Sequence, residues 1–170
     1  MNPKQIATLI LLTAAATTTS VGGIRWADVG VNGLTCSMCS RSVEMSMRRL
    51  DFVDSVVMSL ESTEARIYFK TDARIDLNQV ARAVVNAGFS VRFLRLEMSF
   101  DDIAVNKDGS FVFQGQTYQW MDFEDNPASQ VTLKLVDENF LPKKESAKWK
   151  KKIGASKPRD QQILHVVQLG

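Results

Sequence analysis

The sequence predicts an α+β fold, in which a β-α-β-β-α-β unit over residues 24–96 is followed by a β-rich segment over residues 97–170. Two observations predict this arrangement. In some segments apolar residues recur at every second position, which is typical of strands, and in others they recur every three or four positions, which is typical of helices. The basic residues also change, because residues 24–96 contain one lysine, Lys70, whereas residues 97–170 contain one arginine, Arg159. This shift in composition indicates a second segment.

The first strand and helix follow from the apolar pattern. Residues 24–31 are predicted to form a strand that ends in a loop over residues 32–35. A helix follows over residues 37–50, because Val43, Met47 and Leu50 lie at i, i+4 and i+7 and share one face.

A hairpin and a second helix complete the first unit. Alternating apolar residues predict paired strands over residues 53–60 and 65–69. The second helix is expected over residues 76–87, with Asp76 as its N-cap and Gly88 just after its end. A strand at residues 89–93 closes the order β-α-β-β-α-β, which is the ferredoxin-like arrangement with two helices on one face of an antiparallel sheet.

The second segment is predicted to be a small, barrel-like β module of unknown role. Its expected strands cover residues 100–105, 110–113, 117–123, 130–136 and 162–169. Residues 143–159 are basic and are interrupted by Gly and Pro, so we expect a solvated loop there in preference to a binding patch for anionic lipid or acidic partners.

The N-terminus has the layout of a secretory signal. Lys4 precedes an apolar run over residues 6–16, which is shorter than the roughly 20 residues of a membrane-spanning helix. Small residues follow, so we assign residues 1–20 as a signal peptide with cleavage between about residues 16 and 23. The expectation is a periplasmic or otherwise extracytoplasmic protein that is not an integral membrane protein after cleavage.

Composition and motifs argue against two classes of function. The net charge of +2 gives no electrostatic reason to expect a nucleic-acid partner. No Ser/His/Asp set, paired catalytic carboxylates or phosphate-binding Gly loop stands out, so the sequence predicts no enzyme. His165, the sole histidine, lies in an alternating run and is interpreted as structural.

The two cysteines carry the candidate chemistry. They form the motif Cys36-Ser-Met-Cys39, with Cys36 in the loop and Cys39 in the first turn of the predicted helix. The N–H groups and the positive dipole end of a helix N-terminus favour thiolates. Soft sulfur ligands select soft ions, and two-coordinate binding suits Cu(I), Ag(I) or Hg(II), whereas closed Zn(II) sites usually have four ligands. The pair therefore predicts a metal site, with Cu(I) favoured.

A C-x-x-C motif has two rival interpretations. It can mark a thioredoxin-type redox site, but such a site needs a cis-proline loop, and no proline lies between Pro3 and Pro127. A structural disulfide would close a very short loop and stabilise the chain little. We treat the disulfide as a state of the site.

Residues 24–96 resemble the heavy-metal-associated domain family, which includes copper chaperones, N-terminal domains of copper ATPases and a periplasmic mercury-binding protein. Residues 33–40 are close to the family's G-M-T-C-x-x-C motif, with Leu34 in place of methionine. Further matches are Val43 and Glu44, residues 52–56, and Ala87-Gly88-Phe89 before the last strand, where the family often has tyrosine in place of Phe89.

The resemblance implies that Cys36 and Cys39 are the metal ligands, with Thr35, Met38 and Phe89 as candidate residues around them. It implies capture of Cu(I) and its transfer to a copper-transporting ATPase or another thiol-bearing carrier. Hg(II), Ag(I) and Zn(II) remain alternative ions. A thiol-disulfide redox protein and a metal-switched interaction protein remain alternatives of other classes.

Overall fold

A computed structural model describes residues 23–154 and 163–170. The expected signal segment, residues 1–20, lies outside the described residues. The elements in chain order are β1 (Gly23–Asn32), α1 (Ser37–Arg48), β2 (Val53–Ser59), β3 (Glu64–Phe69), α2 (Leu77–Asn86), β4 (Ser90–Ser99), β5 (Ser110–Phe113), β6 (Gln116–Trp120), β7 (Gln130–Leu135), the 3₁₀ turn η1 (Glu138–Phe140), α3 (Lys143–Ile153) and β8 (Leu164–Gln168).

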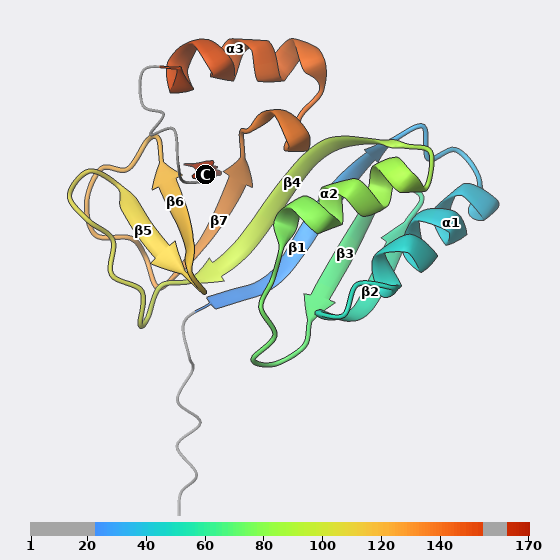
Figure 1. Cartoon of the computed structure of the whole chain (residues 1–170), viewed down its shortest axis with the longest axis horizontal. Coiled ribbons are helices and arrows are strands. Elements are labelled where there is room, and N and C mark those ends of the chain that lie inside the picture. Colours follow the sequence, from blue (N-terminus) through green and yellow to red (C-terminus); the bar gives the residue numbers. More distant parts are fainter. Residues whose placement is uncertain (1–22, 155–162) are drawn as a thin grey trace, which may run out of the picture.

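The first six elements form the predicted ferredoxin-like β-α-β-β-α-β unit. Helices α1 and α2 cover one face of its sheet (Figure 1). Asp76 caps α2, because its carboxylate accepts the backbone N–H groups of Asn78 and Gln79 at 2.9 and 3.2 Å. Gly88 ends α2 with a φ of +90°, a conformation that glycine adopts without the penalty of a Cβ atom.

All eight strands join one sheet in the order β2-β3-β1-β4-β7-β8-β6-β5. Strand β4 connects the two segments, because it pairs antiparallel with β1 on one side and with β7 on the other. The apolar side chains of both segments belong to one hydrophobic core. The strand order is open, with β2 and β5 at its two edges, so the barrel-like expectation is wrong.

The strand predicted over residues 100–105 is also wrong. The chain turns at Asp101-Asp102, where the Asp101 carboxylate accepts a hydrogen bond from Ser99 Oγ at 2.6 Å. Asp is disfavoured in strands and favoured in turns. Only Val105 makes an isolated bridge, to Phe111. Phe100 instead packs in the core against the rings of Phe111 and Trp120.

The solvated loop predicted over residues 143–159 is wrong for its first part, because Lys143–Ile153 form helix α3. Pro142 is the N-cap of the helix, with φ −59° and ψ 146°, and its missing N–H costs no hydrogen bond within the helix at that position. Trp149 and Ile153, four residues apart, pack against Val136, Leu141 and Val167. This small apolar contact anchors α3 to the sheet. The helix was not predicted because most of its residues are charged. Residues 155–159 lie outside the described residues.

Candidate metal site

The loop between β1 and α1 is anchored to the hydrophobic core by the side chain of Leu34. Gly33 allows the chain to leave β1 with a φ of +83°, and the Thr35 N–H then bonds the Gly33 carbonyl at 3.0 Å. These turns direct the Leu34 side chain into the core, where it is only 2% exposed. Leucine thus fills the place of the family's methionine, and Thr35 lies exposed at the surface.

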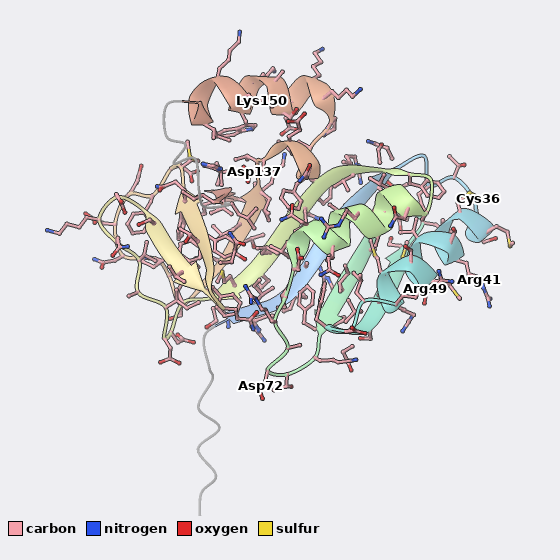
Figure 2. The ribbon with its side chains drawn as sticks, viewed as in Figure 1. Cys36, Arg41, Arg49, Asp72, Asp137 and Lys150 are labelled. Carbon is pink, nitrogen blue, oxygen red and sulfur yellow. A yellow bond between two sulfur atoms is a disulfide. The ribbon has the colours of Figure 1, made fainter. Side chains whose placement is uncertain are left out.

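Cys36 and Cys39 lie side by side at the start of α1. Cys36 is the N-cap of the helix, and its Sγ accepts the backbone N–H of Cys39 at 3.2 Å. The two Cα atoms are 5.2 Å apart, and the two sulfur atoms are joined in a disulfide. Cys36 is exposed and Cys39 is half-buried. Figure 2 shows Cys36 at the outer end of the molecule, where α1 begins. A partner molecule can therefore reach the pair from solvent.

The end of α2 places Phe89 beside this loop. The Gly88 N–H bonds the Val85 carbonyl at 2.9 Å, and the Phe89 N–H bonds the Val84 carbonyl at 3.1 Å. These two bonds form a Schellman motif. They hold Phe89 half-buried against the core, with its Cδ1 3.7 Å from the position that a Cβ atom on Gly33 would occupy. The phenylalanine ring packs beside the loop but offers no hydroxyl to a sulfur atom.

A groove of about 600 Å³ lies between α1 and α2, and its lining includes Met38, which stands between the two cysteines in the chain. Met38 lines its end and is 74% exposed, and Met45 lies further along. Arg41 from α1, Arg49 at the C-cap of α1 and Arg82 from α2 also line the groove, and no acidic residue does so among the described residues. Figure 2 shows Arg41 and Arg49 following Cys36 along α1. The sequence reasoning missed this basic surface, because its third arginine comes from the other helix.

His165 is structural, as predicted. It is buried in β8 at 3% exposure. Its backbone N–H donates to Asp137 Oδ2, and its ring Nδ1 contacts Asp137 Oδ1, both at 2.7 Å. In residues 23–154 and 163–170, no group of three or more His, Cys, Asp and Glu side chains is arranged to hold a metal ion. The described residues thus present a two-sulfur motif and no larger ligand cluster.

The heavy-metal-associated domain model matches residues 28–90, which include both cysteines. The copper chaperone CopZ of Bacillus subtilis is 31% identical over 61 residues, and the match covers 36% of this chain and 87% of that protein. The chain belongs to the heavy-metal-associated domain family. Residues 28–90 thus form its heavy-metal-associated domain, and domains of this chaperone-like type are typically not enzymes.

Two further relatives define the extent of the likeness. A copper-transporting ATPase of Arabidopsis thaliana is 29% identical over 97 residues, which are 57% of this chain but only 9% of the ATPase. A solved copper-binding domain of a P-type ATPase is 28% identical, with a TM-score of 0.37, covering 41% of this chain and 92% of that domain. The match to the ATPase therefore reaches only a small part of the ATPase chain. No helix in the described part of this chain is both long and apolar enough to cross a membrane.

Proposed function

We propose that this chain is exported and captures one soft metal ion, Cu(I), between the thiolates of Cys36 and Cys39, and then transfers the ion to a thiol-bearing partner. The observation that carries the proposal is the contact between the two sulfur atoms at an exposed helix start. Sulfur atoms that can bond to each other can, once reduced, also turn toward one ion. The likeness to a copper chaperone and to a copper-transporting ATPase supports Cu(I) as the cargo.

The chemistry of the site supports a soft ion of low coordination number. Each thiolate is a soft donor, and Cu(I), Ag(I) and Hg(II) accept two such donors, whereas Zn(II) usually requires four ligands. The Cys39 N–H already points at Cys36 Sγ, so negative charge on that sulfur is stabilised by a hydrogen bond and by the helix dipole. Met38 lies between the two cysteines in the chain and is 74% exposed, so we keep it as a residue around the ion and assign the ligand role to the two cysteines alone.

Transfer requires access to the ion and a surface that orients the partner. An incoming thiolate coordinates the bound ion, one cysteine leaves, and a second incoming thiolate displaces the other, so that the ion is never released to water. The exposure of Cys36 permits this approach. The arginine-lined groove next to the motif would orient a carrier with acidic residues around its own thiols, such as a metal-binding domain of a copper-transporting ATPase.

The disulfide between Cys36 and Cys39 supports control of metal binding by the redox state of the pair, and it also supports a second candidate function. Only thiolates bind the ion, so the bonded form of Cys36 and Cys39 is inert toward Cu(I) until a reductant supplies two electrons and two protons. Bound Cu(I) in turn protects both thiols by stabilising the reduced state through mass action. The alternative is a thiol-disulfide redox protein, in which this exchange is the purpose of the site.

The decisive experiment is an anaerobic Cu(I) titration of the reduced chain against a competing chelator of known affinity. We expect one ion per chain, and we expect Cys36→Ser and Cys39→Ser each to remove most of the affinity. Ser42→Ala, which changes a hydroxyl on the groove side of α1, is the matched control and should bind normally. Near-native affinity in the double Cys→Ser variant would place the site elsewhere.

Two additional measurements separate the alternatives. Thiol alkylation with mass readout under a mild oxidant should show protection by one equivalent of Cu(I), and equal oxidation with and without the ion would support the redox alternative. A competition between Cu(I) and Hg(II) tests the choice of ion. For export, an intact Met1 on the protein from the soluble cytoplasm of its host would reject the signal assignment.

A further inference from the structure

Helix α3 presents a row of lysines to solvent. Lys144, Lys148 and Lys151 are exposed and lie at i, i+4 and i+7, so they share one side of the helix. The opposite side carries Ser146, which is buried, and Trp149 and Ile153, which pack on the sheet segment. In Figure 2 the nitrogen-tipped side chains of α3 point away from the body of the molecule. The helix is thus anchored by one face and positively charged on the other.

Three other charged side chains of α3, those of Glu145, Lys150 and Lys152, have partners within the protein. Lys150 Nζ lies 2.5 Å from Glu138, and Glu145 accepts a bond from Lys134 at 2.6 Å. Lys152 lies over the ring of Trp149 at 4.8 Å. Within the described residues, no acidic side chain forms an ion pair with Lys144, Lys148 or Lys151. Their charge is therefore available to a partner.

Helix stability does not explain the row. Lysines in the last turn, Lys150 to Lys152, interact favourably with the helix dipole, but Lys143 and Lys144 occupy the first turn, where positive charge is disfavoured. The pairs Lys144–Lys148 and Lys148–Lys151 also repel each other at i, i+4 and i, i+3. Each of these unfavourable charge interactions is small, but all of them act on the same exposed row of lysines.

We propose that the outer face of α3 binds the anionic headgroups of a lipid bilayer and holds the metal-binding domain at a membrane surface. Charge complementarity between the lysine row and anionic headgroups identifies the bilayer as the binding partner. A stable protein interface has an apolar or aromatic centre, and none of the exposed large apolar side chains of the described residues lies on α3. A row of lysines with no apolar centre matches a charged surface, on which each lysine contributes about fivefold to binding. The attachment is electrostatic, because Trp149 and Ile153 are engaged in the protein's own core.

The experiment is co-sedimentation of the full reduced chain with vesicles of phosphatidylcholine containing 30% phosphatidylglycerol, and with vesicles of phosphatidylcholine alone. The neutral vesicles report any contribution of the apolar run at residues 6–16. Lys148→Gln/Lys151→Gln should weaken binding to the anionic vesicles about 25-fold, and raising the salt should weaken the unaltered chain in the same way. The matched control is Lys70→Gln/Lys107→Gln, which removes the same charge from two exposed sites outside α3 and should bind normally. Glutamine has nearly the helix propensity of lysine, so α3 should persist, and far-UV circular dichroism checks this.

Three results would overturn the proposal: equal binding of the two double variants, equal binding to neutral and anionic vesicles, or retention on a DNA duplex without retention on vesicles. The outcome is independent of the metal site. The Cys36→Ser/Cys39→Ser variant should bind anionic vesicles like the unaltered chain, so loss of Cu(I) binding and loss of lipid binding are measured separately.

Discussion

Leu34 is the residue through which the core holds the metal loop, and its truncation tests that role. The side chain is 2% exposed, so Leu34→Ala removes buried methyl and methylene groups and leaves a cavity. Substitutions of this kind cost about 2–5 kcal/mol. We expect a loss near ~3 kcal/mol in the free energy of unfolding, a large fraction of the roughly 5–15 kcal/mol typical of small domains. The affinity for Cu(I) should fall too, because the loop must then be ordered before both sulfurs face one ion.

The assay is urea denaturation of the reduced chain, so that the Cys36–Cys39 disulfide does not contribute to the measured stability. The matched control is Leu60→Ala, because Leu60 is 48% exposed after the end of β2. Its cost should stay within about 0.5 kcal/mol. A loss below about 1 kcal/mol for Leu34→Ala, with an unchanged denaturant slope, would show that the loop is not held by the core.

Three further outcomes follow from the structure. Ser40→Ala should raise the free energy of unfolding by about 1 kcal/mol in the same assay, because the Ser40 hydroxyl is buried without a hydrogen-bond partner in the described residues; a destabilised variant would reveal a bond to the loop. Asp137→Ala should cost about 2–3 kcal/mol, because it leaves the buried His165 N–H without an acceptor, and a neutral result would contradict this. Burial raises the pKa of Tyr118 above its ordinary value of 10.0. The contribution of the neutral Tyr118 hydroxyl to the free energy of unfolding is therefore complete below pH 10 and is lost as pH rises further. Tyr118→Phe should then lose less stability than the unaltered chain in alkaline denaturation, and equal losses would exclude Tyr118 as the cause.

The first unit was predictable because its signals are local. Asp76 and Gly88 mark the two ends of α2 through hydrogen bonds to residues only two to four positions away. The boundaries moved by only a few residues, as for α1, which ends at Arg48 and not at residue 50. Cys36 and Cys39 are three positions apart, so a helix start was sufficient to bring their sulfur atoms together.

The second segment was harder because few of its contacts are local. Helix α3 has a lysine-rich sequence with only two apolar residues toward the sheet, and those residues pack against Val136, just after β7, and Val167 of β8. The Asp101-Asp102 turn was missed because the apolar residues on either side of it matched a strand pattern.

The sequence by itself determined the order of the first unit, the caps of its second helix and the pair of cysteines at a helix start, because these depend on backbone preferences and short-range bonds. Only the tertiary structure decided the union of both segments through β4 and β7, the arginine groove between α1 and α2, and the outward row of lysines on α3. Each of these depends on which faces of distant segments pack together, and that choice is made by the burial of one shared core.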